Sequence, residues 1–276
     1  MKIQRLAILG SGSMGTAILS GLLKSGLDAE RVSVSTNSAA TASKLADELG
    51  VNAFAQELAA DANSLTVRGA DLVLVAVKPA YVAEVLAEVA AELDPDALVI
   101  SVAAGITNAT MQAALPSTVA VIRSMPNTPA IVGRAVTGLA AGDRATAEQL
   151  QTARELFETV GKTIVLHESM IDALSTVSGS GPAYVFYLIE QFTAAAEDLG
   201  FSEADAKLMV HETFLGAAEL IQATQKSPAE LRRQVTSPNG TTMRAIAELE
   251  KGNLHELFNA ATRAALARAK EIAEGK

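Results

Sequence analysis

Short apolar runs alternate with longer amphipathic stretches in the first part of the chain. The runs have the length of strands and are apolar at nearly every position, as expected of strands buried on both faces of a sheet. They span residues 6–9, 32–35, 72–77, 98–102 and 119–122. The stretches between them have helical periodicity and span residues 16–25, 40–49, 81–93 and 109–115. This alternation predicts an α/β fold with a doubly wound parallel sheet, and further strands at 136–140 and 163–166 beyond a helix at 146–160.

Strand-like runs stop near Ile171, and the rest of the chain has helical periodicity only. The expected helices span residues 183–199, 203–225, 229–234, 242–251 and 254–274. Gly200, Pro228 and Gly252 interrupt the pattern where one helix should end or another begin. We therefore expect two domains, an α/β domain over residues 1–166 and an all-α domain over residues 167–276.

Composition narrows the classes of function. The 276 residues include 22 Lys and Arg against 31 Asp and Glu, a formal net charge of −9, and they contain no cysteine. The chain has no basic cluster for a nucleic acid, no run near the ~20 apolar residues of a membrane helix, and no thiolate for a disulfide or a metal. The N-terminal apolar run is too short for a secretory signal, so we expect a cytoplasmic protein. An acidic protein must bind an anionic ligand through local hydrogen-bond donors.

A glycine-rich loop follows the first predicted strand. It is a full G-x-G-x-x-G, made of Gly10, Ser11, Gly12, Ser13, Met14 and Gly15. The first glycine allows a tight turn, the second lets a pyrophosphate touch the backbone, and the third lets the helix pack on the strand. Strand, loop and helix come in the required order, so the loop predicts a dinucleotide-binding Rossmann-type domain. The alternative is an ordinary glycine-rich turn.

The residues after the second predicted strand bear on the choice of nucleotide. NAD-binding domains carry an acidic residue there, which accepts hydrogen bonds from the adenosine ribose. Here the positions are Thr36, Asn37 and Ser38, whose hydroxyl and amide groups are donors for a 2′-phosphate. The pattern favours NADPH and leaves NADH usable, because the usual arginine is missing as well.

Three further segments follow strands, at the edge of the sheet where ligands bind in doubly wound folds. They are Ala76, Val77, Lys78 and Pro79; Ala103, Ala104 and Gly105; and the run from Arg123 to Pro129. Small residues at these positions would admit a flat nicotinamide ring, and the two prolines of the third segment would make it rigid. Taken singly, each segment is also explained as an ordinary turn.

No catalytic acid, base or nucleophile stands out. His167, His211 and His255 lack the spacing of a triad or of a metal site, so no metal is expected. The segment 178–182 resembles a nucleophile elbow, but no buried strand precedes it. Hydride delivery to a protonated imine needs no further proton, so the missing acid and base fit an imine reductase.

Two segments of the helical half are expected to be helix starts with free backbone N–H groups. They are residues 178–182, which include Ser180 and Gly181, and residues 236–242, which include Ser237, Gly240, Thr241 and Thr242. The N-terminus of a helix attracts anions, so each segment is a candidate site for a small carboxylate. The alternative is that both are simply capped helices.

Together these segments resemble the pyrroline-5-carboxylate reductases, which make L-proline. The similarity covers nearly the whole chain, and its motifs are AVKP at 76–79, SVAAG at 101–105, RSMPNTP at 123–129, SGSGPAY at 178–184 and VTSPNGTT at 235–242. The resemblance implies reduction of (S)-1-pyrroline-5-carboxylate, a small anionic cyclic imine, by NADPH or NADH. It also implies that the C-terminal helical domain forms dimers and that the active site is completed between subunits.

The resemblance implies roles for single residues. Cofactor binding would involve Gly10, Gly12, Met14, Gly15, Asn63 at the ribose, and Val77, Lys78 and Ala104 beside the nicotinamide. Substrate binding would involve Thr241, Thr242 and Ser180, with the Thr242 hydroxyl at the ring nitrogen.

This chain departs from the family pattern at three places. Asn239 stands where many members have glycine, extra residues occur at 52–60, and His167 and Glu168 stand where some members have paired acids near the substrate.

Two alternatives remain from the sequence. One is a β-hydroxyacid dehydrogenase or another imine reductase of the same plan, but residues 182–191 contain no lysine of the kind such dehydrogenases use as an acid. The other is a non-catalytic NADP sensor, which would not need the 235–242 segment.

Overall fold

The chain forms two compact units in the computed structural model, which describes residues 3–273. The first unit contains residues 3–180 and 265–273, and the second contains residues 181–264. The expected boundary after residue 166 lies earlier than this division. The difference arises because α7 (Ile171–Leu174), which comes after residue 166, packs against β6 (Ala120–Met125) and β7 (Ala135–Ala141) of the first unit.

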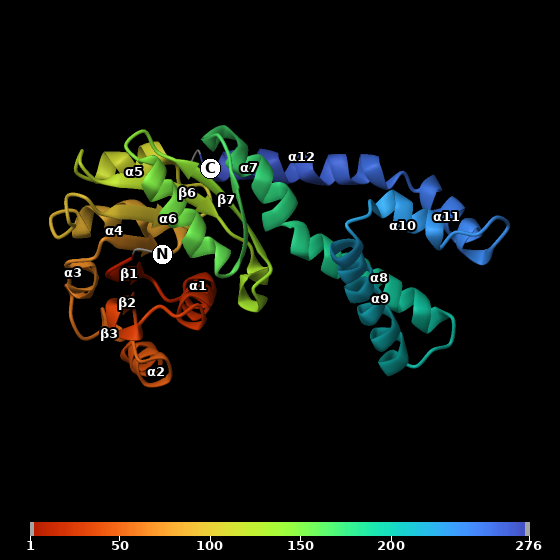
Figure 1. Ribbon diagram of the computed structural model, residues 1–276, viewed down its shortest axis with the longest axis horizontal. Coiled ribbons are helices and arrows are strands. Elements are labelled where there is room, and N and C mark those ends of the chain that lie inside the picture. The colour runs from red at the N-terminus through yellow and green to blue at the C-terminus, as the bar shows by residue number, and fades with distance from the viewer. Residues whose placement is uncertain (1–2, 274–276) are drawn as a thin grey trace. The chain divides into compact units, whose positions relative to one another are not determined.

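The first unit is built on one eight-stranded sheet of order β3-β2-β1-β4-β5-β6-β7-β8, which carries helices on both sides (Figure 1). The remaining strands are β1 (Leu6–Leu9), β2 (Val32–Thr36), β3 (Asn52–Ala55), β4 (Leu72–Val75), β5 (Leu98–Ser101) and β8 (Gly161–Val165). All neighbours from β3 to β6 pair in parallel, which confirms the doubly wound arrangement for six strands. The parallel prediction does not extend further: β7 runs antiparallel to β6, because the chain returns directly after β6 without a crossover α-helix.

Helices bury apolar side chains against each face of this sheet. One face is covered by α1 (Ser13–Lys24), α2 (Ala39–Leu49) and α6 (Ala147–Glu158), and the other by α3 (Ala62–Val67), α4 (Val82–Val89) and α5 (Asn108–Ala114). Strand residues alternate between the two cores: Ile8 joins the first and Leu9 the second. Because successive strand side chains point to opposite faces, a strand buried on both sides is apolar throughout.

Several elements of the first unit were not predicted, among them an edge strand and the helix that follows it. The segment 52–60, interpreted as extra residues, contains the edge strand β3, and α3 follows it. Only Ala55 of β3 is buried, because an edge strand with the sequence Asn-Ala-Phe-Ala is largely open to solvent. It therefore lacks the continuous apolar run by which a central strand is predicted.

The second unit is helical, as predicted. Its elements are α8 (Gly181–Asp198), α9 (Glu203–Thr224), α10 (Pro228–Gln234), α11 (Thr241–Lys251) and the first part of α12 (Leu254–Ala273). The rest of α12, from residue 265, belongs to the first unit, and its expected last residue, 274, lies outside the described residues. α8 packs against α9, and the Ser202 Oγ caps α9 by accepting the Asp205 N–H at 3.2 Å.

Many apolar side chains of the second unit are exposed. Phe186, Leu199 and Leu208 have exposed fractions of 65%, 80% and 63%. An exposed apolar surface of this extent is typical of a protein interface.

Candidate functional site

The glycine loop between β1 and α1 needs its first and third glycines for packing. Gly10 has a φ of 96°, and a Cβ there would lie 2.9 Å from the Val77 nitrogen. A Cβ on Gly15 would lie 2.6 Å from the Gly10 carbonyl oxygen. A Cβ on Gly12, by contrast, would meet no protein atom within 4 Å. The protein itself does not require glycine at position 12, and the bare backbone there leaves room for a ligand.

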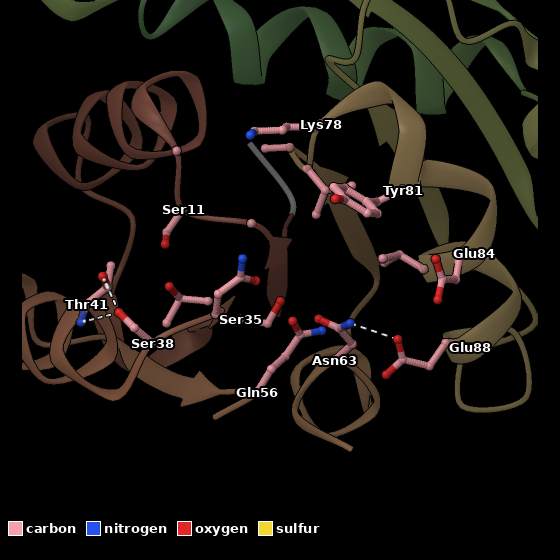
Figure 2. A pocket seen from close by; sticks show the side chains of 17 residues that line it. Ser11, Ser35, Ser38, Thr41, Gln56, Asn63, Lys78, Tyr81, Glu84 and Glu88 are labelled. Atoms are coloured by element: carbon pink, nitrogen blue, oxygen red, sulfur yellow. Dashed lines mark hydrogen bonds between the residues drawn. The ribbon is translucent and has the colours of Figure 1, made fainter. Parts of the chain in front are cut away.

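A cavity of about 710 Å³ opens beside this loop, at the carboxyl ends of β1, β2 and β4 (Figure 2). The strand order changes direction at this point: β2 and β3 are added on one side of β1, and β4 and β5 on the other. Doubly wound folds bind their ligands at such a switch point. The volume lies within the range of small-molecule sites. The cavity therefore has the position and size expected of a nucleotide site in a Rossmann-type domain.

Nine of the predicted cofactor residues line this cavity. They are Gly10, Ser11, Gly12, Thr36, Asn37, Asn63, Ala76, Val77 and Lys78. Four further predicted residues are not part of the lining, although they follow Gly12 or Lys78 within three positions; they are Ser13, Met14, Gly15 and Pro79. Ser38, the third donor expected after the second strand, lines the cavity as well. The lining is completed by residues that the sequence did not indicate, which are Ser35, Thr41, Gln56, Tyr81, Glu84, Val85 and Glu88. Most of these come from elements that only the tertiary structure brings to the loop.

One end of the cavity is formed by hydroxyl groups at the start of α2. The Ser38 Oγ and the Thr41 Oγ1 lie 2.8 Å apart, and the Thr41 N–H donates to the Ser38 Oγ at 3.3 Å (Figure 2). The neighbouring Ala39 N–H donates to the Glu57 Oε2 at 2.8 Å. Donors and one carboxylate thus meet at the end of β2.

Asn63 lies on the opposite side of the cavity, on α3. Its side chain is almost fully buried, and its Nδ2 donates to the Oε2 of Glu88 on α4 at 2.9 Å (Figure 2). This bond fixes which way the amide faces. Asn63 is therefore oriented within the cavity, although its role toward a ribose stays a prediction.

The segment after β5 is separate from the cavity lining. Ala103 is buried, and its N–H donates to the Ser101 Oγ at 3.2 Å, while Gly105 has a φ of 77°. Ala103, Ala104 and Gly105 stand at the carboxyl end of the strand next to β4, so they extend the same edge of the sheet. Their contact with a nicotinamide stays a prediction.

A helix begins within residues 178–182, at Gly181, but a π turn precedes it where the sequence suggested an open loop. α7 (Ile171–Leu174) continues into a π turn (Ser175–Gly179), and α8 begins at Gly181 directly after Ser180. The Ser180 N–H donates to the Ser175 carbonyl at 2.8 Å, so it is not a free donor. The serine and glycine residues that suggested an open helix start instead accommodate one extra residue in the helical turn. Such π turns occur frequently at functional sites.

Glu168 has structural partners within the first unit. Its Oε1 accepts the Asn108 N–H at 2.6 Å and lies 3.7 Å from the Arg123 Nη1. Arg123 is buried and also pairs with Asp172 of α7. These contacts join the end of β6 to α5 and α7, which assigns Arg123 and Glu168 a positioning role in the fold.

The predicted donor segment of the second unit is a helix start. α11 begins at Thr241, and Gly240 precedes it without a side-chain hydrogen bond to the helix. The first N–H groups of an α-helix have no intrahelical acceptor, so those of Thr241 and Thr242 are available. A Cβ on Gly240 would lie 2.4 Å from the Ser237 Oγ and 3.1 Å from the Ser237 carbonyl oxygen, so a larger residue here would force the Ser237 side chain to move.

Asn239, one of the departures from the family pattern, is explained by the backbone. Its φ is 61°, a left-handed conformation that glycine adopts readily and that asparagine tolerates better than other residues. The replacement therefore preserves the turn from Ser237 to Gly240, in which the Gly240 N–H donates to the Ser237 carbonyl at 3.1 Å.

Two properties concern the described residues as a whole. Within residues 3–273, no three His, Asp or Glu side chains gather as a metal site would require. In the same part of the chain, none of the helices is both long enough and apolar enough to cross a membrane.

Comparison with known proteins finds a different family model for each half of the chain and relatives that match nearly its full length. Residues 168–272 match the family model described as pyrroline-5-carboxylate reductase dimerisation, and residues 5–105 match the model described as NADP oxidoreductase coenzyme F420-dependent. A pyrroline-5-carboxylate reductase of Pseudomonas aeruginosa is 38% identical, over 99% of this chain and 98% of the relative. One of Corynebacterium melassecola is 37% identical, over 97% of this chain and 98% of the relative.

Solved structures agree with this assignment. A pyrroline-5-carboxylate reductase of Coxiella burnetii superposes with a TM-score of 0.90 at 36% identity, over 97% of this chain and 98% of its own. The Plasmodium falciparum pyrroline carboxylate reductase, solved with NADP bound, shares the fold with a TM-score of 0.83 at 24% identity, over 99% of this chain and 98% of its own. The dimerisation model supports self-association, and the NADP oxidoreductase model supports a nicotinamide cofactor. The chain belongs to the pyrroline-5-carboxylate reductase family.

Proposed function

We propose that this chain reduces the C=N bond of (S)-1-pyrroline-5-carboxylate to give L-proline, with NADPH preferred over NADH. The assignment of the cofactor site rests on Gly12. Its backbone faces a cavity at the switch point of the sheet, and a Cβ at this position would contact no protein atom. When bound, a reduced nicotinamide supplies the hydride. The pyrophosphate would lie at the first turn of α1, which no side chain caps.

The preference for NADPH rests on the end of β2. Asn37, Ser38 and Thr41 line the cavity there and offer amide and hydroxyl donors to a 2′-phosphate. Thr36 completes the strand, and none of these residues is acidic. Ala103, Ala104 and Gly105 would lie beside the nicotinamide, because small residues leave space for a flat ring.

The substrate carboxylate is assigned to the segment 237–242, with Ser237, Gly240 and Thr241 forming the turn. The free N–H groups at the start of α11 attract a negative charge in a protein whose net charge is −9. The Thr242 hydroxyl oxygen accepts the N–H of the protonated imine and so orients the C=N bond. Ser180 and Gly181 belong to the second substrate segment, where the Ser180 side chain, and not its backbone N–H, is the available group.

The reaction needs no acid from the protein. Hydride adds to the imine carbon, and the π electron pair of the C=N bond moves to a nitrogen that already carries its proton. The product is the neutral secondary amine, which takes a further proton from water. The residues of this chain bind and orient the two reactants and exclude water.

Self-association is proposed to run through the helical second unit, whose exposed apolar side chains need a partner. Light scattering on the full chain should give at least twice the 28.5 kDa of one chain. A monomer mass at working concentration would reject this part. The cytoplasmic location stays a prediction.

The activity is tested by following the absorbance of NADPH and NADH after addition of pyrroline-5-carboxylate, with a β-hydroxyacid and NADP⁺ run in parallel. We expect turnover with the cyclic imine only, and faster turnover with NADPH at limiting cofactor. Turnover of the hydroxyacid would favour the dehydrogenase alternative. Cofactor binding without turnover of either substrate would favour a sensor and contradict the proposal.

A further inference from the structure

The Glu57 carboxylate binds the start of α2. Its Oε2 accepts the Ala39 N–H at 2.8 Å. Two backbone bonds join the same turn to the loop after β2: the Gln56 N–H donates to the Thr36 carbonyl at 2.9 Å, and the Glu57 N–H donates to the Asn37 carbonyl at 3.0 Å. Glu57 is exposed, yet three hydrogen bonds hold its turn beside this loop.

This loop is the part of a Rossmann domain that meets the 2′ position of the adenosine ribose. NAD-binding domains place an acidic residue at the end of the second strand to bind the 2′-hydroxyl. In this chain the end of β2 has no acidic residue. Because β3 pairs in parallel with β2, the turn after β3, which contains Glu57, lies beside the end of β2. This turn therefore places a carboxylate at the N-terminus of α2. Glu57 follows the cavity-lining residue Gln56 in the chain, and its hydrogen-bond partner Ala39 follows the cavity-lining residue Ser38.

We infer that Glu57 is a specificity-determining residue that reduces the preference for NADPH over NADH. The inference rests on the proposed function, because it requires the adenosine to lie in the cavity beside β2. Two effects act in the same direction. The carboxylate occupies the Ala39 N–H, a donor at a helix N-terminus that a 2′-phosphate would otherwise use. Its charge also repels the 2′-phosphate, whereas NADH has a neutral hydroxyl at that position.

Ser38 and Thr41 act against Glu57. Their hydroxyls line the cavity and bond to each other at 2.8 Å, so a small rotation turns either proton toward a phosphate. These donors favour NADPH, and the Glu57 charge weakens that preference without reversing it. The arrangement accounts for an enzyme that selects NADPH modestly and still uses NADH.

The charge of Glu57 can be removed without removing its hydrogen bond. In Glu57→Gln the amide oxygen still accepts the Ala39 N–H. Glu48→Gln removes the same charge from an exposed position near the other end of α2 and is the matched control. Dissociation constants for NADPH and NADH are measured on the full chain by fluorescence titration, at low and at high salt.

We expect the ratio of the NADH constant to the NADPH constant to rise roughly three- to tenfold in Glu57→Gln at low salt. The rise should shrink at about 0.5 M salt, where charges on the surface are screened. Glu48→Gln should leave the ratio unchanged.

Three results would contradict the inference, and one of them would also contradict the proposed function. An unchanged ratio in Glu57→Gln, or an equal change for both cofactors, would make Glu57 only a helix cap. An equal rise in Glu48→Gln would attribute the effect to net charge. Failure of the unmodified chain to bind either cofactor would instead overturn the cofactor site itself, and the inference with it.

Discussion

Asn127 holds the carbonyl oxygen of Ser178: the Asn127 Nδ2 donates to that oxygen at 2.9 Å. The Oδ1 of the same amide accepts the Val136 N–H of β7 at 2.9 Å. Asn127 is only 7% exposed, so water does not compete for these bonds. A π turn breaks the regular helical hydrogen-bond pattern, and here a side chain from the loop after β6 satisfies one of its carbonyls. The RSMPNTP segment therefore supports the π turn, in addition to being rigid.

Asn127→Ala should destabilise the first unit and lower the catalytic rate. Two partly buried backbone groups would lose their partner, which costs roughly 1–3 kcal/mol in the free energy of unfolding. If the π turn positions Ser180, kcat for the imine falls while the NADPH dissociation constant stays within about twofold. Urea denaturation and steady-state kinetics measure the two effects. Gln151→Ala, on the exposed surface of α6, is the control and should change neither.

Alanine at Gly12 and at Gly15 should have opposite consequences. The Cβ of Gly15→Ala would lie 2.6 Å from the Gly10 carbonyl oxygen, so we expect a loss of about 1–3 kcal/mol in the free energy of unfolding. The Cβ of Gly12→Ala meets no protein atom, so the melting temperature of this variant should stay unchanged. Its affinity for NADPH should fall on the order of tenfold, because the methyl group would occupy space needed by the pyrophosphate. Thermal melting and cofactor titration on both variants separate the two effects. Retained NADPH affinity in Gly12→Ala would place the pyrophosphate elsewhere.

The bond between Asn63 and Glu88 should contribute to cofactor binding as a pair. Asn63→Ala and Glu88→Ala should each raise the NADPH dissociation constant, and the double variant should be less impaired than the sum of the two. A coupling energy of about 0.5–3 kcal/mol is expected of residues in direct contact. Glu88→Gln keeps an oxygen acceptor for the Asn63 Nδ2 and should restore most of the affinity. Strictly additive effects would show that Glu88 does not position Asn63.

Thr242→Ala should separate substrate chemistry from cofactor binding. The hydroxyl is assigned to the imine nitrogen, so its loss should lower kcat/KM for pyrroline-5-carboxylate by about 10- to 100-fold. The NADPH dissociation constant should stay unchanged, and Thr242→Ser, which keeps the hydroxyl, should recover most of the activity. Steady-state kinetics that are equal for Thr242→Ala and the unmodified chain would remove Thr242 from the site.

The sequence predicted the structure best where a short run of residues is explained by a single structural requirement. The G-x-G-x-x-G from Gly10 to Gly15 lies in the predicted turn, because the positive φ of Gly10 and the close contact at Gly15 can be met by glycine alone. The central strands were predicted for the same reason, since burial on both faces leaves an apolar run. The helix start at Gly240 also follows from local residues.

Long-range contacts could not be predicted in this way. Glu57 reaches the end of β2 only because β3 pairs with β2, and Glu88 reaches Asn63 only because α4 packs beside α3. The π turn at Ser175–Gly179 was also missed, since serine and glycine residues before a proline are equally typical of a helix start. Its support by Asn127 depends on residues about fifty positions apart in the chain.

The most direct test of the central claim is to follow the transferred hydrogen. NADPH carrying deuterium at the reactive C4 position of the nicotinamide is mixed with the full chain and unlabelled pyrroline-5-carboxylate, and the product is analysed by mass spectrometry and NMR. If the chain delivers hydride to the imine carbon, the product is L-proline with a single deuterium at C5. Cofactor oxidation that gives no proline, or proline without the label, would contradict the account.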